Sequence, residues 1–132
     1  MEVTGYHHVA LTVSDLDRSE AWYAALVDLE VVLDEPGELR RARVYRLAGT
    51  AELLGLVEHA ANDGTAFAPT TTGLDHVAFS VATREALDGW VARLDELGIE
   101  HSGAIDIPMG AILNLKDPDG IALSVFWDRD HS

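Results

Sequence analysis

The stretch Gly73-Leu-Asp-His-Val-Ala-Phe-Ser-Val81 decides the fold, because the chain carries a second copy of it that begins at Gly5. Residues 5–29 and 73–97 align without a gap at an offset of 68, and nine of the 25 aligned positions are identical. Unrelated segments would share about two such positions from residue frequencies alone. We therefore interpret the chain as one folding unit that was duplicated and fused.

Each copy opens with the alternating pattern of a β-strand. In the second copy one face is bulky and apolar, with Val77, Phe79 and Val81, and the opposite face begins with His76 and continues with small side chains. A helix pattern follows each strand and would cover the bulky face. Its apolar residues are Trp22, Ala25, Leu26 and Leu29 in the first copy and Leu87, Trp90, Val91 and Leu94 in the second. The opposite face suits the floor of a cleft.

The pattern predicts an α+β fold in which each half has the order β-α-β-β-β. The first module covers residues 5–59, the linker 60–72, and the second module 73–128. Strands are expected at 6–13, 30–33, 41–47, 52–59, 76–81, 99–101, 111–116 and 121–127. The first helix is expected to run to about residue 28 after a cap at Ser14 or Asp15. Each half is marginal alone, so the halves should cover one another within the chain or across a dimer.

Local signals support the second module. Thr83 is placed to cap its helix, and Gly98 stands just past the helix end, where a left-handed residue commonly closes a helix. Between the last two strands, Asp117-Pro-Asp-Gly120 predicts a tight hairpin turn.

Composition excludes several classes of protein and site. The chain of 132 residues has no cysteine, which excludes disulfides and thiolate ligands. Its net charge of -14 opposes binding to nucleic acid, because the field would repel phosphates. No apolar run approaches the roughly 20 residues that span a bilayer, and no signal segment opens the chain. We therefore expect a cytoplasmic protein that binds neither nucleic acid nor membranes.

The sequence resembles the vicinal oxygen chelate superfamily, which includes glyoxalase I, extradiol dioxygenases, fosfomycin-resistance enzymes and bleomycin-binding proteins. The resemblance rests on residues 7–19, on Asp75-His-Val-Ala-Phe-Ser-Val81 and on the Asp117 turn. It implies two tandem βαβββ modules that form a cupped mixed sheet around a central cleft. It also implies a small-molecule ligand and a homodimer.

Members of this superfamily place a divalent metal on the cleft floor, held by a histidine on the first strand of a module and a carboxylate on its last. By that pattern His8 and His76 are the metal ligands. The carboxylate positions fall at Gly55 and Ser124, so both carboxylates are missing. His59 lies four residues after Gly55 on the same expected strand, so its side chain would reach the same face of the sheet. Together with His8 and His76 it would complete a three-histidine site for Zn²⁺ or Ni²⁺.

The remaining candidate residues follow from the same comparison. Glu58 or His59 would act as the catalytic base, although Glu58 would need a bulge to reach the floor. The expected ligand-lining residues are Arg43, Tyr45, Met109, Asn114 and Ser124. No role is assigned to His7, His101 or His131.

Two functions remain open. The first is a metal-dependent lyase, isomerase or dioxygenase, in which Zn²⁺, Fe²⁺, Mn²⁺ or Ni²⁺ at His8 and His76 polarises paired substrate oxygens. The second is a metal-free protein that sequesters or carries a small molecule, as the bleomycin-binding members do. The histidine pair favours the first function, whereas the missing carboxylates and the negative charge favour the second.

Overall fold

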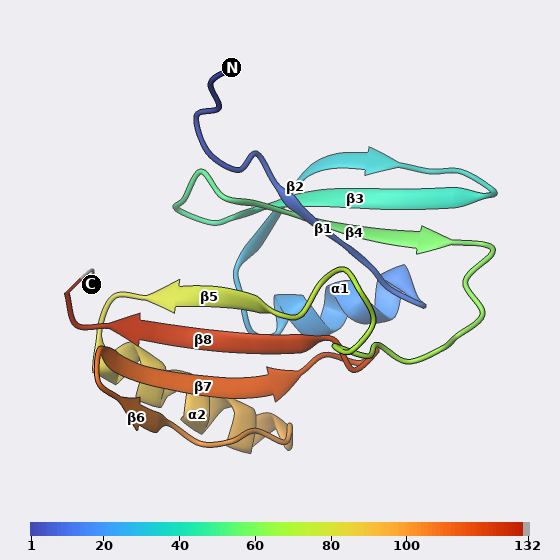
Figure 1. The fold of residues 1–132 in the computed structure, drawn as a ribbon. Helices are drawn as coiled ribbons and strands as arrows, with labels where there is room; N and C mark the ends of the chain where they lie inside the picture. The colour runs from blue at the N-terminus through green and yellow to red at the C-terminus, as the bar shows by residue number, and fades with distance from the viewer. Residues whose placement is uncertain (131–132) are drawn as a thin grey trace. The chain divides into compact units, whose positions relative to one another are not determined.

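A computed structural model describes residues 1–130 and confirms the α+β fold with two β-α-β-β-β modules (Figure 1). The first module contains β1 (Val9–Thr12), α1 (Leu16–Ala24), β2 (Leu29–Glu35), β3 (Arg40–Leu47) and β4 (Leu53–His59). The second contains β5 (Val77–Val81), α2 (Arg84–Leu97), β6 (Ile105–Ile107), β7 (Gly110–Lys116) and β8 (Ala122–Asp128). The chain divides into two compact units, and the second unit begins at Ala66.

Each unit has one four-stranded mixed sheet. The strand order is β1-β4-β3-β2 in the first unit and β5-β8-β7-β6 in the second. In both sheets the first strand of the module pairs in parallel with the last, and the other pairs are antiparallel. The two modules thus share one topology, as the sequence repeat predicts.

Three expected elements differ from the structure, and the first of them is the opening strand, which begins at Val9 instead of residue 6. The first helix ends at Ala24 instead of residue 28, because the chain tightens there and the N–H groups of Leu26 and Val27 both bond to the Tyr23 carbonyl. The large buried residues of α1 are Leu16 and Tyr23, whereas Ala25 and Leu26 follow the helix and are only partly buried.

The prediction of a strand at residues 99–101 is also wrong. Only an isolated bridge between His101 and Leu115 forms there, and the edge strand of the second sheet is β6 instead. The short apolar start of the 99–101 segment follows directly after the helix end at Gly98, so it serves as a connection.

Helix α2 covers one face of the second sheet, as Figure 1 shows. Leu87 and Leu94 on the helix are fully buried, and the Phe79 ring on β5 stacks on Trp90 at a centroid distance of 6.4 Å. Burying one leucine side chain stabilises a fold by about 1.5–3 kcal/mol. The apolar stripe predicted for this helix is therefore confirmed, and the opposite face of the sheet is left without a helix from its own unit.

The caps of both helices fix where they begin and where α2 ends. Asp15 accepts the backbone N–H of Arg18, and Thr83 accepts that of Ala86. Gly98 closes α2 with a left-handed φ of 70°. These three sites agree with the sequence expectation.

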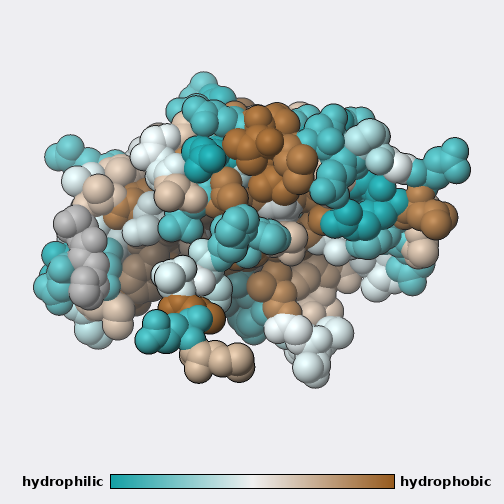
Figure 2. Space-filling model, turned by 90° about the horizontal axis from the view of Figure 1, so that it is seen from above, coloured by the Kyte–Doolittle hydropathy of each residue, from teal (hydrophilic) through white to brown (hydrophobic). Residues whose placement is uncertain are grey.

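Some large apolar side chains stay exposed at the surface. They lie on the edge strand β2 and in the turn after it: Val31, Val32, Leu33 and Leu39. Figure 2 shows hydrophobic surface gathered in patches among hydrophilic side chains. Among residues 1–130, no helix is both long and apolar enough to cross a membrane.

Two glycines of α2 test the role of its C-terminal cap. Neither Gly89 nor Gly98 has an atom within 4 Å of the place where a Cβ would stand, so only backbone conformation separates them. Gly98→Ala should lower the free energy of unfolding by about 1 kcal/mol, because alanine disfavours positive φ. Gly89→Ala should raise it by about 0.5–1 kcal/mol, since Gly89 lies within the helix. Urea unfolding measures both, and equal effects of the same sign would contradict this account.

Candidate functional site

The strand register places the predicted site positions of the two modules in equivalent environments. His8 directly precedes β1 and His76 directly precedes β5. Two residues further along, Ala10 pairs with Gly55 and Ala78 pairs with Ser124. Paired residues point to the same face of a sheet. The four residues therefore lie on the face opposite the module's helix, with Gly55 and Ser124 at matching positions.

A pocket of about 1070 Å³ lies in the second unit. His76, Asn114 and Ser124, three of the residues expected at the site, line it together. Its other lining residues come from the segment before β5, the end of α2 and the segment after it, β7, β8 and the turn between these two strands: Asp75, Asp95, Ile99, Glu100, His101, Ile112, Leu115, Lys116, Asp117, Ala122 and Leu123. A hollow with an apolar wall and a few polar groups is typical of small-molecule sites.

Ser124 is engaged with its cross-strand neighbour. Its hydroxyl donates to Oδ1 of Asn114 over 2.9 Å, and the two residues are directly paired between β7 and β8. This bond orients the Asn114 amide and leaves its nitrogen, Nδ2, without a partner in the part of the chain that the structure describes. At this floor position the second module therefore presents an amide donor instead of a carboxylate.

His76 is also held by a neighbour. Its Nδ1 lies 2.7 Å from Oδ1 of Asp75, and the imidazole is about half exposed, at 51%. The Asp75 carboxylate thus orients the imidazole that lines the pocket.

His101 is a pocket residue that the sequence did not indicate. Its Nε2 lies 2.6 Å from Asp95 of α2, and its Nδ1 accepts the Gly103 N–H at 2.9 Å. The Ser102 hydroxyl accepts the Asn114 N–H, and the Ser102 N–H donates to the Asn114 carbonyl. These bonds tie the segment after α2 to β7 and so build one wall of the pocket. The near-buried position of this histidine, 11% exposed, gives no sequence signal of its own.

The other expected site residues lie elsewhere. His8 contacts His7 through their Nδ1 atoms at 2.9 Å, and both are exposed in the first unit. His59 is exposed at the end of β4 and shares the face of Gly55. Met109 is 51% exposed in the turn between β6 and β7. None of these three lines the pocket of the second unit.

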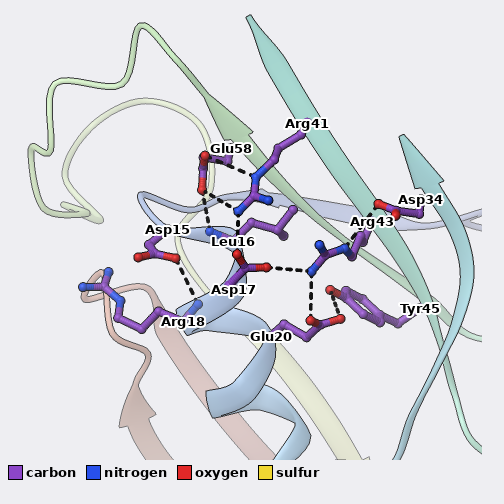
Figure 3. Close-up of polar contacts among 10 residues, drawn as sticks. All are labelled: Asp15, Leu16, Asp17, Arg18, Glu20, Asp34, Arg41, Arg43, Tyr45 and Glu58. Carbon is purple, nitrogen blue, oxygen red and sulfur yellow. Dashed lines mark hydrogen bonds and ion pairs between the residues drawn. The ribbon is translucent and has the colours of Figure 1, made fainter. Parts of the chain in front are cut away.

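Arg43, Tyr45 and Glu58 point to the helix-covered face of the first sheet, where α1 supplies partners for all three (Figure 3). Arg43 is paired with Asp17 at 3.0 Å and Glu20 at 2.8 Å. The Tyr45 hydroxyl donates to Glu20 at 2.9 Å, and this tyrosine is only 1% exposed. Arg43 and Tyr45 are thus already satisfied within the protein, and their contact with a ligand stays a prediction.

Glu58 holds the beginning of α1. One oxygen accepts the Leu16 N–H at 2.7 Å, and the other accepts from Nε of Arg41 at 3.3 Å. A carboxylate at this place satisfies an N–H that the helix itself leaves unpaired, and it interacts favourably with the helix dipole. Both oxygens of Glu58 therefore serve the fold, and its role as a base stays a prediction.

Electrostatics within this cluster follow from the same contacts. Hydrogen bonds from Arg41 and Arg43 lower the pKa of Asp17 below its ordinary value of 3.8. Burial, together with the bond to Glu20, raises the pKa of the Tyr45 phenol, so this hydroxyl is a hydrogen-bond donor at neutral pH. The cluster is a closed ion-pair network that fixes α1 on its sheet.

Within residues 1–130, neither unit offers the donor set of a divalent-metal site. In the second unit the expected carboxylate position is occupied by Ser124, whose hydroxyl donates a hydrogen bond to Asn114. In the first unit the same position is occupied by Gly55, which has no side chain. In residues 1–130 no group of three or more His, Asp or Glu side chains is arranged to hold a metal ion. Protein metal centres of the expected kinds need at least three ligands. The residues present do not fit a resident metal, and the metal predicted for His8 and His76 gains no support from them.

Comparison with known proteins agrees with the fold. The family model described as "Glyoxalase/Bleomycin resistance protein/Dioxygenase superfamily" matches residues 5–125. The chain belongs to this superfamily. A search of curated proteins gave no significant match.

Solved structures of the superfamily are similar over nearly the whole chain. A glyoxylase/bleomycin resistance protein/dioxygenase domain from Frankia sp. EAN1pec is 34% identical, with a TM-score of 0.90, and the match covers 97% of this chain and 100% of that one. A glyoxalase family protein from Enterococcus faecalis is 25% identical, with a TM-score of 0.75 and coverage of 92% and 96%.

A fosfomycin resistance protein, FosX from Listeria monocytogenes, shares the fold. A mutant of it, solved with Mn(II) and 1S,2S-dihydroxypropylphosphonic acid, is 19% identical, with a TM-score of 0.75 and coverage of 96% of this chain and 94% of that one. At this identity the likeness concerns the fold alone.

The ion-pair network makes a prediction about pH. Because the pKa of Asp17 is lowered by folding, its contribution to stability is present above about pH 3.8 and is lost as the pH falls through its folded-state pKa. Asp17→Asn should therefore lower the urea midpoint at pH 6, and this difference should shrink steadily as the pH falls below 3.8. Glu38→Gln is the control, since Glu38 is an exposed carboxylate outside the ion pairs that Asp17 makes with Arg41 and Arg43. A difference that stays constant with pH would contradict the role of Asp17.

Proposed function

We propose that this protein binds a small molecule in the pocket of the second unit without a metal ion. The observation that carries the proposal is the hydrogen bond from Ser124 to Asn114 at the floor position where relatives commonly carry a metal-binding carboxylate. A hydroxyl and an amide bind uncharged or weakly charged ligand groups well, but they are poor ligands for transition metals.

The first unit supports the same interpretation. Gly55 cannot be replaced there by a larger side chain without local movement, because a Cβ would stand 3.2 Å from the Ala10 Cβ. The glycine therefore permits the close approach of β1 and β4 at this position. A carboxylate is thus missing from both modules for different local reasons.

The pocket has the composition of a binding site for a small organic molecule. Ile99, Ile112 and Leu123 provide apolar surface, whereas Asn114 and His76 provide hydrogen-bonding groups. Such sites take most of their affinity from apolar contact and their orientation from a few polar groups. Both kinds of contact come from residues of one unit.

A metal-dependent enzyme is the second candidate. The equivalent places of His8 and His76 before the first strand of each module favour it. The base proposed for that activity is His59 or Glu58, and Arg43, Tyr45 and Met109 remain proposed ligand contacts.

The assembly and location of the protein are also proposals. We propose a homodimer, supported by the apolar side chains exposed on β2, and a cytoplasmic location. Native mass measurement tests the dimer, and a monomer at micromolar concentration would contradict it.

Metal analysis separates the two candidate functions. Protein made without a histidine tag and without chelator should contain far less than one metal ion per chain, because the donor set is incomplete. His76→Ala should leave this content unchanged. A stoichiometric metal that disappears in His76→Ala would support the enzyme and contradict the metal-free site.

Ligand binding is tested by NMR with a mixture of small neutral molecules. Binding should shift the backbone signals of Asn114 and Ser124, should persist in the presence of chelator, and should weaken several-fold in Ser124→Ala, since Asn114 then loses its fixed orientation. Ser80→Ala is the matched control, because Ser80 lies on the same face of the sheet but outside the pocket lining. Equal weakening in both variants, or binding abolished by chelator, would contradict the proposal.

A further inference from the structure

The chain has one lysine, Lys116, and it lines the pocket. The eight arginines all have partners within the protein, because each makes a hydrogen bond or an ion pair: Arg18, Arg40, Arg41, Arg43, Arg46, Arg84, Arg93 and Arg129. Lys116 alone among these nine basic residues has no such partner within residues 1–130. In a chain with 23 acidic residues, an unpaired ammonium is unexpected on charge grounds alone.

None of the four carboxylates that line the same pocket forms an ion pair with Lys116 in residues 1–130, and three of them contact other groups. Asp75 is paired with His76, and Asp95 is paired with His101. Asp117, only 6% exposed, accepts the N–H groups of Asp119 and Ile121 at 2.8 and 2.9 Å. Glu100 is the one lining carboxylate without a partner in the described chain. The ammonium is therefore left as a donor to a ligand.

Strand register brings Lys116 and Asn114 to one face. Lys116 pairs with Ala122 and Asn114 pairs with Ser124, so both side chains lie on the face away from α2. They are two residues apart on β7, about 7 Å along the strand, and the four-carbon stem of a lysine spans that distance. The small Ala122 beside Lys116 leaves room above the sheet.

We propose that Lys116 and Asn114 form an oxyanion subsite, which binds the carboxylate of a small organic acid whose hydrocarbon part contacts Ile99 and Ile112. The ammonium supplies charge and up to three donors, and Nδ2 of Asn114 supplies two more. Ser124 fixes which end of the Asn114 amide faces outward, through the bond to Oδ1. The inference rests on the proposed function, and it names the ligand class of that pocket.

The experiment uses the full chain, made with ¹³C-labelled lysine, so that one residue gives the side-chain signals. Three probes share a hydrocarbon tail and differ in charge: hexanoate, hexanamide and hexylammonium. Hexanoate should shift the Lys116 Cε signal saturably and should bind at least tenfold more tightly than hexanamide. Backbone signals of Ile112 and Ser124 report occupation of the pocket for all three probes.

Variants separate charge from structure. Lys116→Gln should weaken hexanoate binding at least tenfold without affecting hexanamide, and Lys116→Arg should retain a large part of it. Arg93→Gln is the matched control, since it also removes one positive charge but lies on α2 outside the pocket lining. Equal weakening in Arg93→Gln would show a general field effect and would overturn the subsite.

The remaining outcomes are distinct from a failure of the proposed function. If hexanamide or hexylammonium occupies the pocket at least as tightly as hexanoate, the oxyanion subsite is wrong while small-molecule binding stands; tighter binding of hexylammonium would point to Glu100 instead. If no probe shifts the pocket signals, the subsite is overturned, and the metal analysis then decides between the two candidate functions.

Discussion

The structure depends on one constraint, the parallel pairing of the first strand of each module with its last strand. This pairing sets which side chains face the helix and which face away, because residues alternate between the two faces of a sheet. Val77, Phe79 and Val125 turn toward α2 in the second unit, whereas Ala78 and Ser124 turn away from it. Every feature of the pocket floor follows from this alternation.

The two copies of the module have since diverged on their helix-covered faces. Arg43 and Tyr45 of β3 stand where β7 has Leu113 and Leu115, as the equivalent pairing of both strands shows. In the first unit ion pairs add to the burial of Leu16 and Tyr23 in holding the helix, whereas in the second unit this part of the sheet contributes apolar side chains. Paired and hydrogen-bonded charges define one geometry but add little net stability, whereas apolar contacts add more. The same scaffold therefore carries two different ways of fixing its helix.

Much of the fold was predictable from the sequence, because the repeat, the alternation in β5 and the spacing of Leu87 and Leu94 are local signals. The alternation of β3 also puts Arg43 and Tyr45 on one face, but the sequence alone does not show that this face meets α1. The direction of this face depends on Asp17 and Glu20 of α1, which contact Arg43 and Tyr45 only after the helix has docked.

The site was less predictable, for two reasons. His101 enters the pocket wall through bonds to Asp95 and Gly103, and these depend on where the chain turns after Gly98. Lys116 lies two residues after Asn114 on the same strand and is the sole lysine of an acidic chain, which is a signal in the sequence. The resemblance to a metal-binding superfamily, however, points to histidines and carboxylates as the site residues and not to a lysine.

The central claim is that a hydrogen-bonded Ser124 and Asn114 pair has replaced metal coordination at the pocket floor. The most direct measurement is a crystal structure of protein grown with Mn²⁺, with anomalous scattering recorded to locate the ion. The account predicts no anomalous peak bound to His76, and the Ser124 hydroxyl bonded to Asn114. A peak within bonding distance of His76 at full occupancy would contradict it.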